Sequence, residues 1–572
     1  MHTNIIPHMS RPPASSKSST GDSLVGLRSA GCQPADATKS RPLGFGISGF
    51  GISLGFGILG FGISPAAPAA PVPPVPPVPS VPSRPNILFI ISDQINADMI
   101  QALSHNPFIS TPNLDRLANR GLAYTNTYSA NPICMPSRFA MFTGASTAEN
   151  GIRTNIQGTR EKIVPLITTR SMGVLFRNNG YETYYAGKTH LTYGASRNGR
   201  AASTGPNSDN LDNYGFKLLD RDMRDHLAET GAKFLTEHKS GSGKPFLLCL
   251  SFINPHDICT ESSNFLKAGD EETRPLRRQA QLPPDKLKDI LDCLRTVHEQ
   301  ADKKPPAFWE TDASAKLPLN MAPAKDNIAA LRRSRAGGSL RQSQWRRYLW
   351  VYHRLVEVVD REIGVVLDAL DKSPFKDNTI IVFTADHGEM GGSHGLTGKS
   401  ILYEECQRVP FVFAGPGIRH GTDATIVCNG WDLMPTLCDI ASIPAPKQLT
   451  GISLYPNMTK NTPVPPRKYL YLESFPGLQI IADARYKYSL YDSQNPQYEM
   501  LFDIQTDPGE QHNLINDPKY KPLAADLRAQ LKKEAAARNI TLAPKKSPPA
   551  AKAKSKSNAK AKSKPAPSDD DE

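Results

Sequence analysis

The sequence predicts an α/β fold: a large, mostly parallel sheet flanked by helices, followed by a smaller C-terminal antiparallel sheet subdomain. The first observation is that continuous apolar runs alternate with amphipathic segments along much of the 572-residue chain. Such runs are typical of strands buried on both faces of a parallel sheet, and their alternation with helices favours a doubly wound sheet. The second observation is that the apolar segments become shorter after about Pro466, which favours a small antiparallel sheet.

The first strand is predicted at 86–91, where the sequence Asn-Ile-Leu-Phe-Ile-Ile is almost wholly apolar. The helix that follows should begin with Thr111 as its cap and Pro112 in its first turn, and Gly121 should end it. Apolar residues that recur every three or four positions indicate one long helix later in the chain. We therefore expect further buried strands at 181–186, 246–252 and 379–383, the long helix over 345–370, and the strands of the small sheet at 469–472, 480–482 and 486–491.

Charge and composition divide the chain into a folded body and two ends. The formal net charge is +12, of which residues 1–84 and residues 545–572 each carry +4, leaving +4 for the 460 residues between them. Such a body argues against nucleic acid as the main partner, because nucleic-acid-binding surfaces concentrate Lys and Arg. We predict a low-complexity leader over 1–84, a catalytic domain over 85–466 with an insertion at 260–344, a C-terminal subdomain over 467–544, and a disordered Lys/Ala/Ser/Pro tail over 545–572.

The leader has features of an export signal. The uncharged stretch at 43–64 contains the tetrapeptide GFGI four times, and an Ala/Pro run follows it. The stretch is long enough to span a bilayer, but eight of its 22 residues are Gly, which disfavours a stable membrane helix. We therefore expect a periplasmic or secreted protein with no integral membrane domain in its mature form. A low-complexity leader on a cytoplasmic protein is the alternative.

Polar residues follow two of the predicted strands, at the point where each strand ends. Asp93 and Gln94 follow the first strand, and Asp386 and His387 follow the strand at 379–383. In open α/β sheets, ligands bind at the carboxyl ends of the strands. Two carboxylates at one place would repel each other without a cation between them, and oxygen and imidazole ligands suit a single divalent metal ion.

Basic residues follow other strands of the same predicted sheet. Lys188 and His190 follow the strand at 181–186, and His256 follows the strand at 246–252. Lys399 ends a loop rich in Gly and His that could close over a substrate. These side chains would surround an anionic group held on the metal, so the residues predict a metal-assisted hydrolase of an anionic ester. On their own they leave the identity of the anion open.

The segment that narrows the choice is Cys134-Met-Pro-Ser-Arg-Phe-Ala-Met-Phe-Thr-Gly144. It places a thiol at the start of a helix, where unpaired N–H groups favour negative charge, and Arg138 one turn along could reach the same anion. The segment resembles the signature of the formylglycine-dependent sulfatases, a family of the alkaline phosphatase-like superfamily: Cys-x-Pro-Ser-Arg followed at a fixed distance by Thr-Gly. The resemblance covers roughly residues 84–520 and includes Gly187-Lys188-Thr-His190, Asn254-Pro-His256, Thr379–Gly388 and Gly398-Lys399.

The resemblance implies that a formylglycine-generating enzyme reads this motif and converts Cys134 to formylglycine (3-oxoalanine). One hydroxyl of the aldehyde hydrate would attack sulfur, and deprotonation of the second would expel sulfate and regenerate the aldehyde. The resemblance also implies that His190 assists this elimination, and that His256, with Lys399, protonates or stabilises the leaving oxygen.

The resemblance further implies one divalent cation, with Ca²⁺ expected because the family commonly uses it. Many members have Asp-Asp where this chain has Asp93-Gln94, and Asp-Asn where it has Asp386-His387. These departures keep Mg²⁺ and Mn²⁺ as alternatives. The implied metal ligands are Asp93, Gln94, Cys134, Asp386 and His387, and the implied groups on the sulfuryl oxygens are the metal, Arg138, Lys188 and Lys399.

The leading hypothesis is a sulfuric ester hydrolase that acts on a sulfated small molecule or oligosaccharide, either a carbohydrate or an aryl sulfate. A phosphodiester or phosphonate monoester hydrolase of the same superfamily is the nearest alternative, because sulfate and phosphate esters are similar tetrahedra. A non-catalytic protein that binds polyanions through its basic tail is the third. His394 and Glu404 lie near Lys399 in sequence, and they would either touch substrate or hold the loop.

Overall fold

The structure, a computed structural model, describes residues 82–155, 160–191, 211–224, 226–239, 243–259, 342–474, 477–491, 499–538 and 540. Almost all of the predicted leader, most of the predicted insertion and the basic tail lie outside these residues, and the predicted domain boundaries stay predictions. No helix within the described ranges has both the length and the apolar composition needed to cross a bilayer.

A mostly parallel sheet of eight strands forms the centre of the described structure. Its strands are β1 (Asn86–Asp93), β2 (Gly121–Tyr128), β3 (Glu182–Gly187), β4 (Lys217–Asp220), β5 (Phe246–Pro255), β6 (Thr379–Ala385), β7 (Phe411–Ala414) and β8 (Gly421–Cys428). They lie in the order β4-β3-β5-β1-β6-β7-β2-β8. Only β7 runs against its two neighbours, and the other pairs are parallel. The predicted fold class is therefore confirmed.

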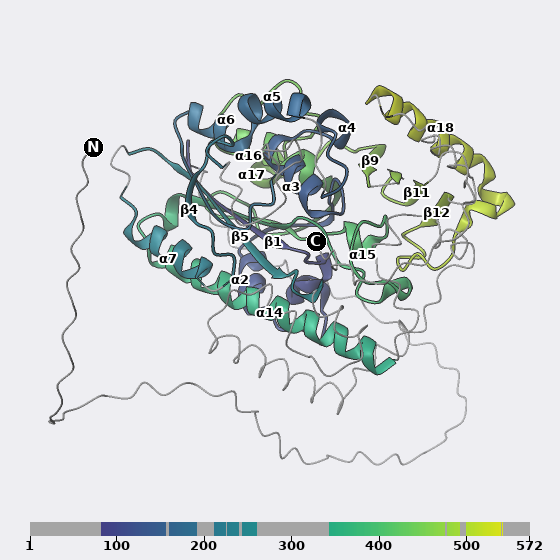
Figure 1. Ribbon diagram of the computed structural model, residues 1–572, viewed down its shortest axis with the longest axis horizontal. Helices are drawn as coiled ribbons and strands as arrows, with labels where there is room; N and C mark the ends of the chain where they lie inside the picture. Colours follow the sequence, from purple (N-terminus) through teal and green to yellow (C-terminus); the bar gives the residue numbers. More distant parts are fainter. Residues whose placement is uncertain are drawn as a thin grey trace, which may run out of the picture. The chain divides into compact units, whose positions relative to one another are not determined.

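Helices cover both faces of this sheet (Figure 1). One face packs against α3 (Cys134–Thr143), α5 (Arg160–Arg170), α6 (Met172–Asn178), α16 (Asn429–Ile440) and α17 (Tyr455–Lys460). The other face packs against α2 (Pro112–Asn119), α7 (Leu227–Glu237) and the predicted long helix, α14 (Gln342–Lys372). Shorter helices are α1 (Gln101–Ser104), α4 (Thr147–Asn150) and α15 (Glu404–Gln407).

Strand β1 lies at the middle of the sheet, between β5 and β6. Ile87, Phe89 and Ile91 point into the core on one face, and Leu88 and Ile90 point into the core on the other. Both faces of the strand are buried, which explains why its sequence is a continuous apolar run rather than an alternating one.

Helix α2 begins and ends for reasons that differ from the prediction. Thr111 precedes the helix, but among the described residues its side chain makes no capping hydrogen bond. Asp360 of α14 accepts from the backbone N–H of Leu114 at 2.8 Å instead. Gly121 does not end the helix but opens β2, where a Cβ would lie 2.1 Å from the carbonyl oxygen of Phe413. This glycine is needed for the close approach of β7, which the local sequence does not reveal.

The smaller sheet is antiparallel, as predicted. Its four strands, β9 (Tyr469–Glu473), β10 (Leu478–Ala482), β11 (Tyr486–Leu490) and β12 (Glu499–Asp503), lie in the order β12-β11-β10-β9. Helix α18 (Lys521–Ala537) lies beside this sheet (Figure 1). Leu527 and Leu531 of the helix pack into the core that it shares with the sheet. Neither β12 nor α18 was predicted, although apolar residues four positions apart would have indicated the helix.

Candidate active site

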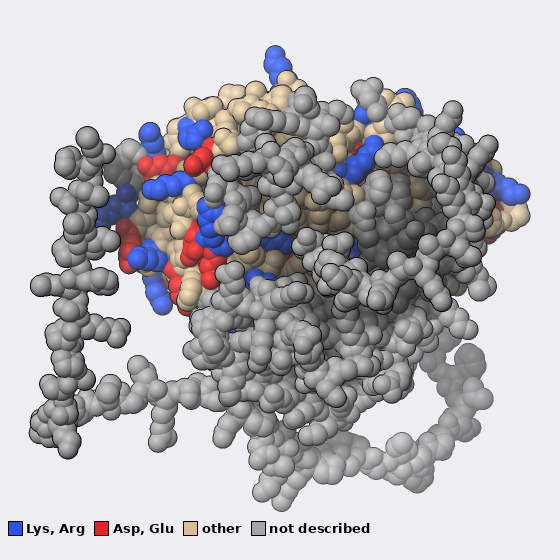
Figure 2. Space-filling view, viewed as in Figure 1, with Lys and Arg blue, Asp and Glu red and all other residues tan. Residues whose placement is uncertain are grey.

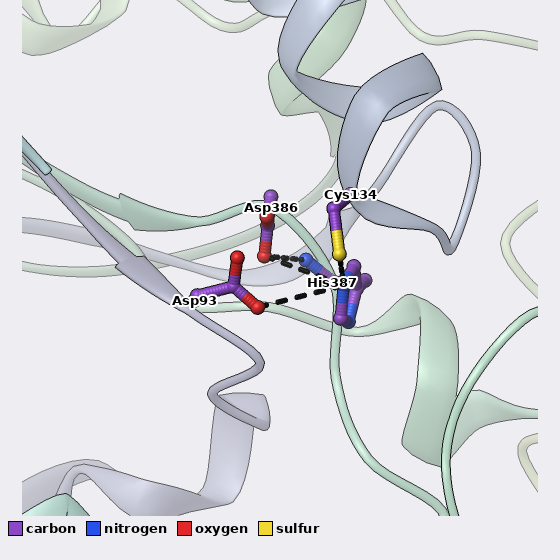
Figure 3. Close-up of side chains that lie close together, drawn as sticks. All are labelled: Asp93, Cys134, Asp386 and His387. Carbon is purple, nitrogen blue, oxygen red and sulfur yellow. Dashed lines mark hydrogen bonds and ion pairs between the residues drawn. The ribbon is translucent and has the colours of Figure 1, made fainter. Parts of the chain in front are cut away.

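Four buried side chains converge at one end of the large sheet. Asp93, Cys134, Asp386 and His387 each offer one ligand atom, and these atoms all lie within 4.8 Å of one another (Figure 3). Nε2 of His387 lies 3.2 Å from Sγ of Cys134, 3.6 Å from Oδ1 of Asp386 and 3.8 Å from Oδ1 of Asp93. The spacing is small enough for a single cation to be shared.

The register of the sheet explains why these residues meet. Strands β1 and β6 are parallel neighbours, with Ser92 paired to Ala385, so Asp93 and Asp386 lie side by side where the two strands end. Cys134 is the first residue of α3, whose packing against the sheet holds the thiol beside the carboxylates. Residues that are far apart in the sequence thus reach one point through the topology of the sheet.

The donor atoms suit a metal ion. Oδ1 of Asp93 is buried and has no hydrogen-bond partner within the described residues, although a buried carboxylate oxygen normally has one. Nδ1 of His387 lies 2.9 Å from the carbonyl oxygen of Gly388, which can only accept. Nδ1 therefore carries hydrogen, and Nε2 faces the other three side chains, as in histidine ligands held by a backbone carbonyl. The residues fit the cation that the sequence implies.

Arg138 contacts the two carboxylates, and the contact with a bound anion that the sequence led us to expect stays a prediction. Its Nε donates to Asp386 at 2.7 Å, one terminal nitrogen donates to Asp93 at 3.1 Å, and the other donates to the carbonyl of Lys188 and the hydroxyl of Ser251. The side chain is fully buried. Within the described residues, the guanidinium thus makes its hydrogen bonds to protein groups, two of which are the carboxylates of Asp93 and Asp386.

Lys188 also contacts a carboxylate, since its Nζ lies 2.5 Å from Oδ2 of Asp93. Burial acts to raise the pKa of Asp93, and so does a charge on Cys134, but Lys188 and other nearby cations outweigh them and hold this pKa well below its usual range. Burial and the charge of Asp93 raise the pKa of Asp386. The pair therefore contains one strongly acidic carboxyl and one weaker one.

Lys399 links Gln94 to Cys134. Its Nζ lies 3.0 Å from Oε1 of Gln94 and 3.0 Å from Sγ of Cys134. Burial alone would raise the pKa of the Cys134 thiol, but Lys399, Lys188 and His387 lower it well below its usual value. The side chain of residue 134 therefore lies where negative charge is strongly favoured.

Gln94 lies beside the group without being part of the four-residue cluster. Its backbone N–H donates to Oδ1 of Asp386 at 3.1 Å, and its side-chain oxygen faces Lys399. The residue has a φ of 74°, in the left-handed region, where the chain turns sharply after β1. Whether it ligates the metal stays a prediction, but its oxygen is directed toward the site.

His190 and His256 both lie near the thiol. Burial lowers the pKa of each, to about 4 for His256, which also feels the charges of Lys188 and Lys399. Neither ring nitrogen of His190 has a hydrogen-bond partner in the part of the chain that the structure describes. Burial therefore disfavours the charged form of both imidazoles.

His394 and Glu404 both make contacts with side chains of the surrounding fold. His394 is buried and stacks on Tyr403, with ring centroids 3.9 Å apart. Glu404 lies 2.9 Å from the buried Lys487 of β11, which also lies 2.9 Å from Glu510. The sequence left two roles open for these residues, touching substrate or holding the loop. These contacts support the second role.

The sequence did not point to Glu389, whose buried carboxylate contacts Gln94 and the loop before Lys399. It lies two residues after His387, in a segment where a Glu is usually exposed. The signal that could have found it is its place between two site residues.

A mostly parallel sheet with buried side chains that could hold a metal ion at the ends of its central strands fits the hydrolases of the alkaline phosphatase-like superfamily. Comparison with known proteins narrows this class. A family model described as Sulfatase matches residues 85–443, and a second, described as N-sulphoglucosamine sulphohydrolase, C-terminal, matches residues 392–537. The chain belongs to the sulfatase family and is a sulfuric ester hydrolase.

Relatives match over most of their length. The Delta 4,5-hexuronate-2-O-sulfatase of Bacteroides thetaiotaomicron is 29% identical over 460 residues, which cover 78% of this chain and 88% of the relative. The N-acetylglucosamine-6-O-sulfatase of the same organism is 25% identical, covering 76% of this chain and 83% of the relative. The solved structure of a 2-O GAG sulfatase has a TM-score of 0.61 and 26% identity, covering 80% of this chain and 93% of that one.

Proposed function

We propose that this sulfatase removes a sulfate ester from a carbohydrate, with Cys134 converted to formylglycine and a divalent cation, Ca²⁺, at the buried group. The observation that carries the proposal is that the Cys134–Gly144 motif begins α3 directly beside Asp93, Asp386 and His387. The carbohydrate substrate is supported by the relatives, whose names specify hexuronate, N-acetylglucosamine and GAG sulfates.

The proposed metal ligands are Asp93, Gln94, residue 134, Asp386 and His387. When bound, the cation would neutralise charge on the sulfate oxygens, and the aldehyde would supply a nucleophilic hydroxyl to sulfur together with a second hydroxyl for sulfate release. Ca²⁺ is preferred because carboxylate and amide oxygens form most of this set, and the imidazole keeps Mg²⁺ and Mn²⁺ as alternatives.

Among the proposed catalytic side chains, Lys399 makes a direct contact with residue 134. Its ammonium lies 3.0 Å from Sγ of Cys134, and in the unmodified protein the negative charges of Cys134 and Asp93 raise its pKa despite burial. Lys399 therefore stays charged at neutral pH and can donate to an anionic oxygen. The neutral His256 can hold the leaving oxygen with it, and His190 can accept the proton lost when sulfate departs.

In this proposal, Arg138 and Lys188 support the carboxylates that would hold the metal ion. Both donate to Asp93, and Arg138 also donates to Asp386, so they fix the orientation of the two carboxylates. Their charges also lower the cost of burying two acidic groups together. This arrangement keeps the ligand oxygens in place before substrate arrives.

Maturation and location form part of the same proposal. The motif at Cys134 would be the substrate of a formylglycine-generating enzyme, and the leader over 1–84 would direct the protein to the periplasm or the exterior, where sulfated polysaccharides are found. Nucleic acid is not expected to be a partner.

The test is to express the protein with and without a formylglycine-generating enzyme and to measure turnover of sulfated sugars. Mass spectrometry should show that residue 134 has gained one oxygen and lost one sulfur and two hydrogens. Release of sulfate from 2-O-sulfated uronides or 6-O-sulfated N-acetylglucosamine should require this change, and Cys134→Ala should abolish it. Full activity of Cys134→Ala would refute the proposal.

The same preparation distinguishes the alternatives. Faster turnover of a nitrophenyl phosphodiester or phosphonate monoester than of any sulfate would favour the phosphoester hydrolase. Absence of ester turnover, together with affinity for polyanions that survives deletion of the catalytic domain, would favour the binding protein.

A further inference from the structure

A single buried carboxylate, that of Glu389, connects Gln94 to the loop that ends at Lys399. The side chain of Glu389 has no exposed surface. Its Oε2 accepts from Nε2 of Gln94 at 2.5 Å. Its Oε1 accepts from the hydroxyl of Tyr348 at 2.7 Å and from the backbone N–H groups of Gly391 at 3.1 Å and Gly398 at 2.6 Å.

The backbone of Glu389 is fixed as well. Its N–H donates to Oδ1 of Asn96 at 2.8 Å, and its carbonyl accepts from Nδ2 of the same residue at 2.9 Å. Asn96 follows β1 by three residues and Glu389 follows β6 by four, so the two segments after the central strands are joined. The carboxylate therefore occupies a defined position relative to both metal-bearing strands.

The charges on either side of Gln94 determine the direction in which its amide points. Lys399 can only donate, so the atom that faces it must be the oxygen. The carboxylate of Glu389 accepts, so the atom that faces it must be the NH₂ group. Glu389 thereby selects the orientation in which Gln94 presents an oxygen, the only side-chain atom of this residue that can bind a cation, toward the buried group.

The same carboxylate oxygen binds both sides of the loop that carries Lys399. Gly391 and Gly398 have φ values of 56° and 82°, in the left-handed region that glycine adopts readily. Both point their N–H groups at Oε1 of Glu389, and the next residue, Lys399, reaches Gln94 and Cys134. The position of the ammonium thus depends on the carboxylate that closes the loop.

We propose that Glu389 is a positioning residue that orients Gln94 as a metal ligand and holds Lys399 against residue 134. This inference rests on the proposed function, because it assigns Gln94 and Lys399 the roles given there. Groups that orient a metal ligand from behind typically change metal affinity or activity by about 10- to 100-fold when they are removed. We expect Glu389→Gln to act in this range while the fold persists.

The first test is metal binding by the unmodified protein, which needs no sulfatase activity. Ca²⁺ is titrated calorimetrically into chelator-treated wild type, Glu389→Gln and Glu499→Gln. Glu499 is a matched control, because it is also buried but lies on β12 of the small sheet and pairs with Arg528 of α18. In Glu389→Gln, an NH₂ group can face Gln94 and favour the flipped amide, so the dissociation constant should rise about 10- to 100-fold. The Glu499→Gln protein should bind as wild type does.

A charge exchange provides the rescue. In the double variant Glu389→Gln with Gln94→Glu, the carboxylate moves to position 94, where either of its oxygens can face the cation, and the amide introduced at position 389 can donate to it. The net charge is unchanged, and metal affinity should recover most of the loss. If Glu389 only supports the loop, the double variant should not recover metal affinity.

Kinetics test the second half of the inference. With full formylglycine conversion and saturating metal, Glu389→Gln should lower kcat about 10- to 100-fold and change KM less, because Lys399 is displaced from the reacting residue. Tyr348→Phe, which removes one donor and no charge, should have a smaller effect in the same direction.

The outcomes of these experiments distinguish a failure of the proposed role of Glu389 from a failure of the proposed function. If wild type binds Ca²⁺ and Glu389→Gln binds it equally well with unchanged kcat, the role of Glu389 is overturned and the proposed function stands. If wild type binds none of Ca²⁺, Mg²⁺ and Mn²⁺, the metal assignment is wrong. The proposed role of Glu389 is then wrong as well.

Discussion

Replacing Arg138 by Met should destabilise the unmodified, metal-free protein by about 3–5 kcal/mol, the usual cost of removing one partner of a fully buried ion pair. Arg138, Asp93 and Asp386 have no exposed side-chain surface. Asp93 would keep Lys188 as its partner at 2.5 Å. Asp386 would lose its 2.7 Å contact with Arg138 and keep only backbone donors and the more distant His387. The loss should therefore arise mainly at Asp386.

The assay is urea denaturation of wild type and variant, both produced without the modifying enzyme and both treated with chelator. Arg116→Met is the control, because its pair with Asp368 is partly exposed, at 36% and 55% of the two side chains (Figure 2 shows the charged surface of one face), and should contribute only about 0–1 kcal/mol. Saturating Ca²⁺ should narrow the gap between wild type and Arg138→Met, since a cation replaces part of the missing charge. A loss below about 1 kcal/mol, or a gap that Ca²⁺ leaves unchanged, would contradict this account of the Asp386 carboxylate.

Three further predictions concern stability. Lys487→Met should cost about 3–5 kcal/mol, measured by urea denaturation, because it leaves Glu404 and Glu510 without their shared buried cation; a cost typical of a surface pair would contradict this. Burial raises the pKa of Glu405 to about 7 from a usual value of 4.5, so its contribution to the unfolding free energy is complete below pH 4.5 and is lost as the pH rises through 7. The melting temperature of Glu405→Gln should therefore fall less between pH 5 and 7 than that of wild type, and equal slopes would exclude this origin. Chelation of a cation present at 100 times its dissociation constant should lower stability by about 2.7 kcal/mol, and Asp386→Asn should show a smaller drop in the same melting experiment.

The central strands and the main site residues were predictable because their signals are local. The segment from Asn86 to Asp93 is mainly apolar before it reaches a carboxylate, and the segment from Thr379 to Asp386 has the same pattern. Parallel pairing then brings both carboxylates to one edge, a consequence of sheet geometry that needs no knowledge of the rest of the fold. Lys399 and Cys134 were found from motifs rather than from periodicity.

The partners of the charged residues were not predictable, because they depend on distant segments. The sequence indicates that Arg138 lies near the site, but not that its guanidinium faces two carboxylates from beneath. The contact between Gln94 and Glu389 joins residues 295 positions apart. Short strands such as β4 and β7, with four residues each, carry too little pattern to stand out.

The complete burial of α3 limits when Cys134 could be modified relative to folding. All ten residues of the helix are inaccessible, including the thiol and arginine that the maturation machinery would have to grasp. If Cys134 is converted to formylglycine as proposed, the modifying enzyme would have to reach the thiol before this helix docks on the sheet. In that case modification and folding would compete in newly made chains, and a chain that folded first would keep its fold but lack the aldehyde.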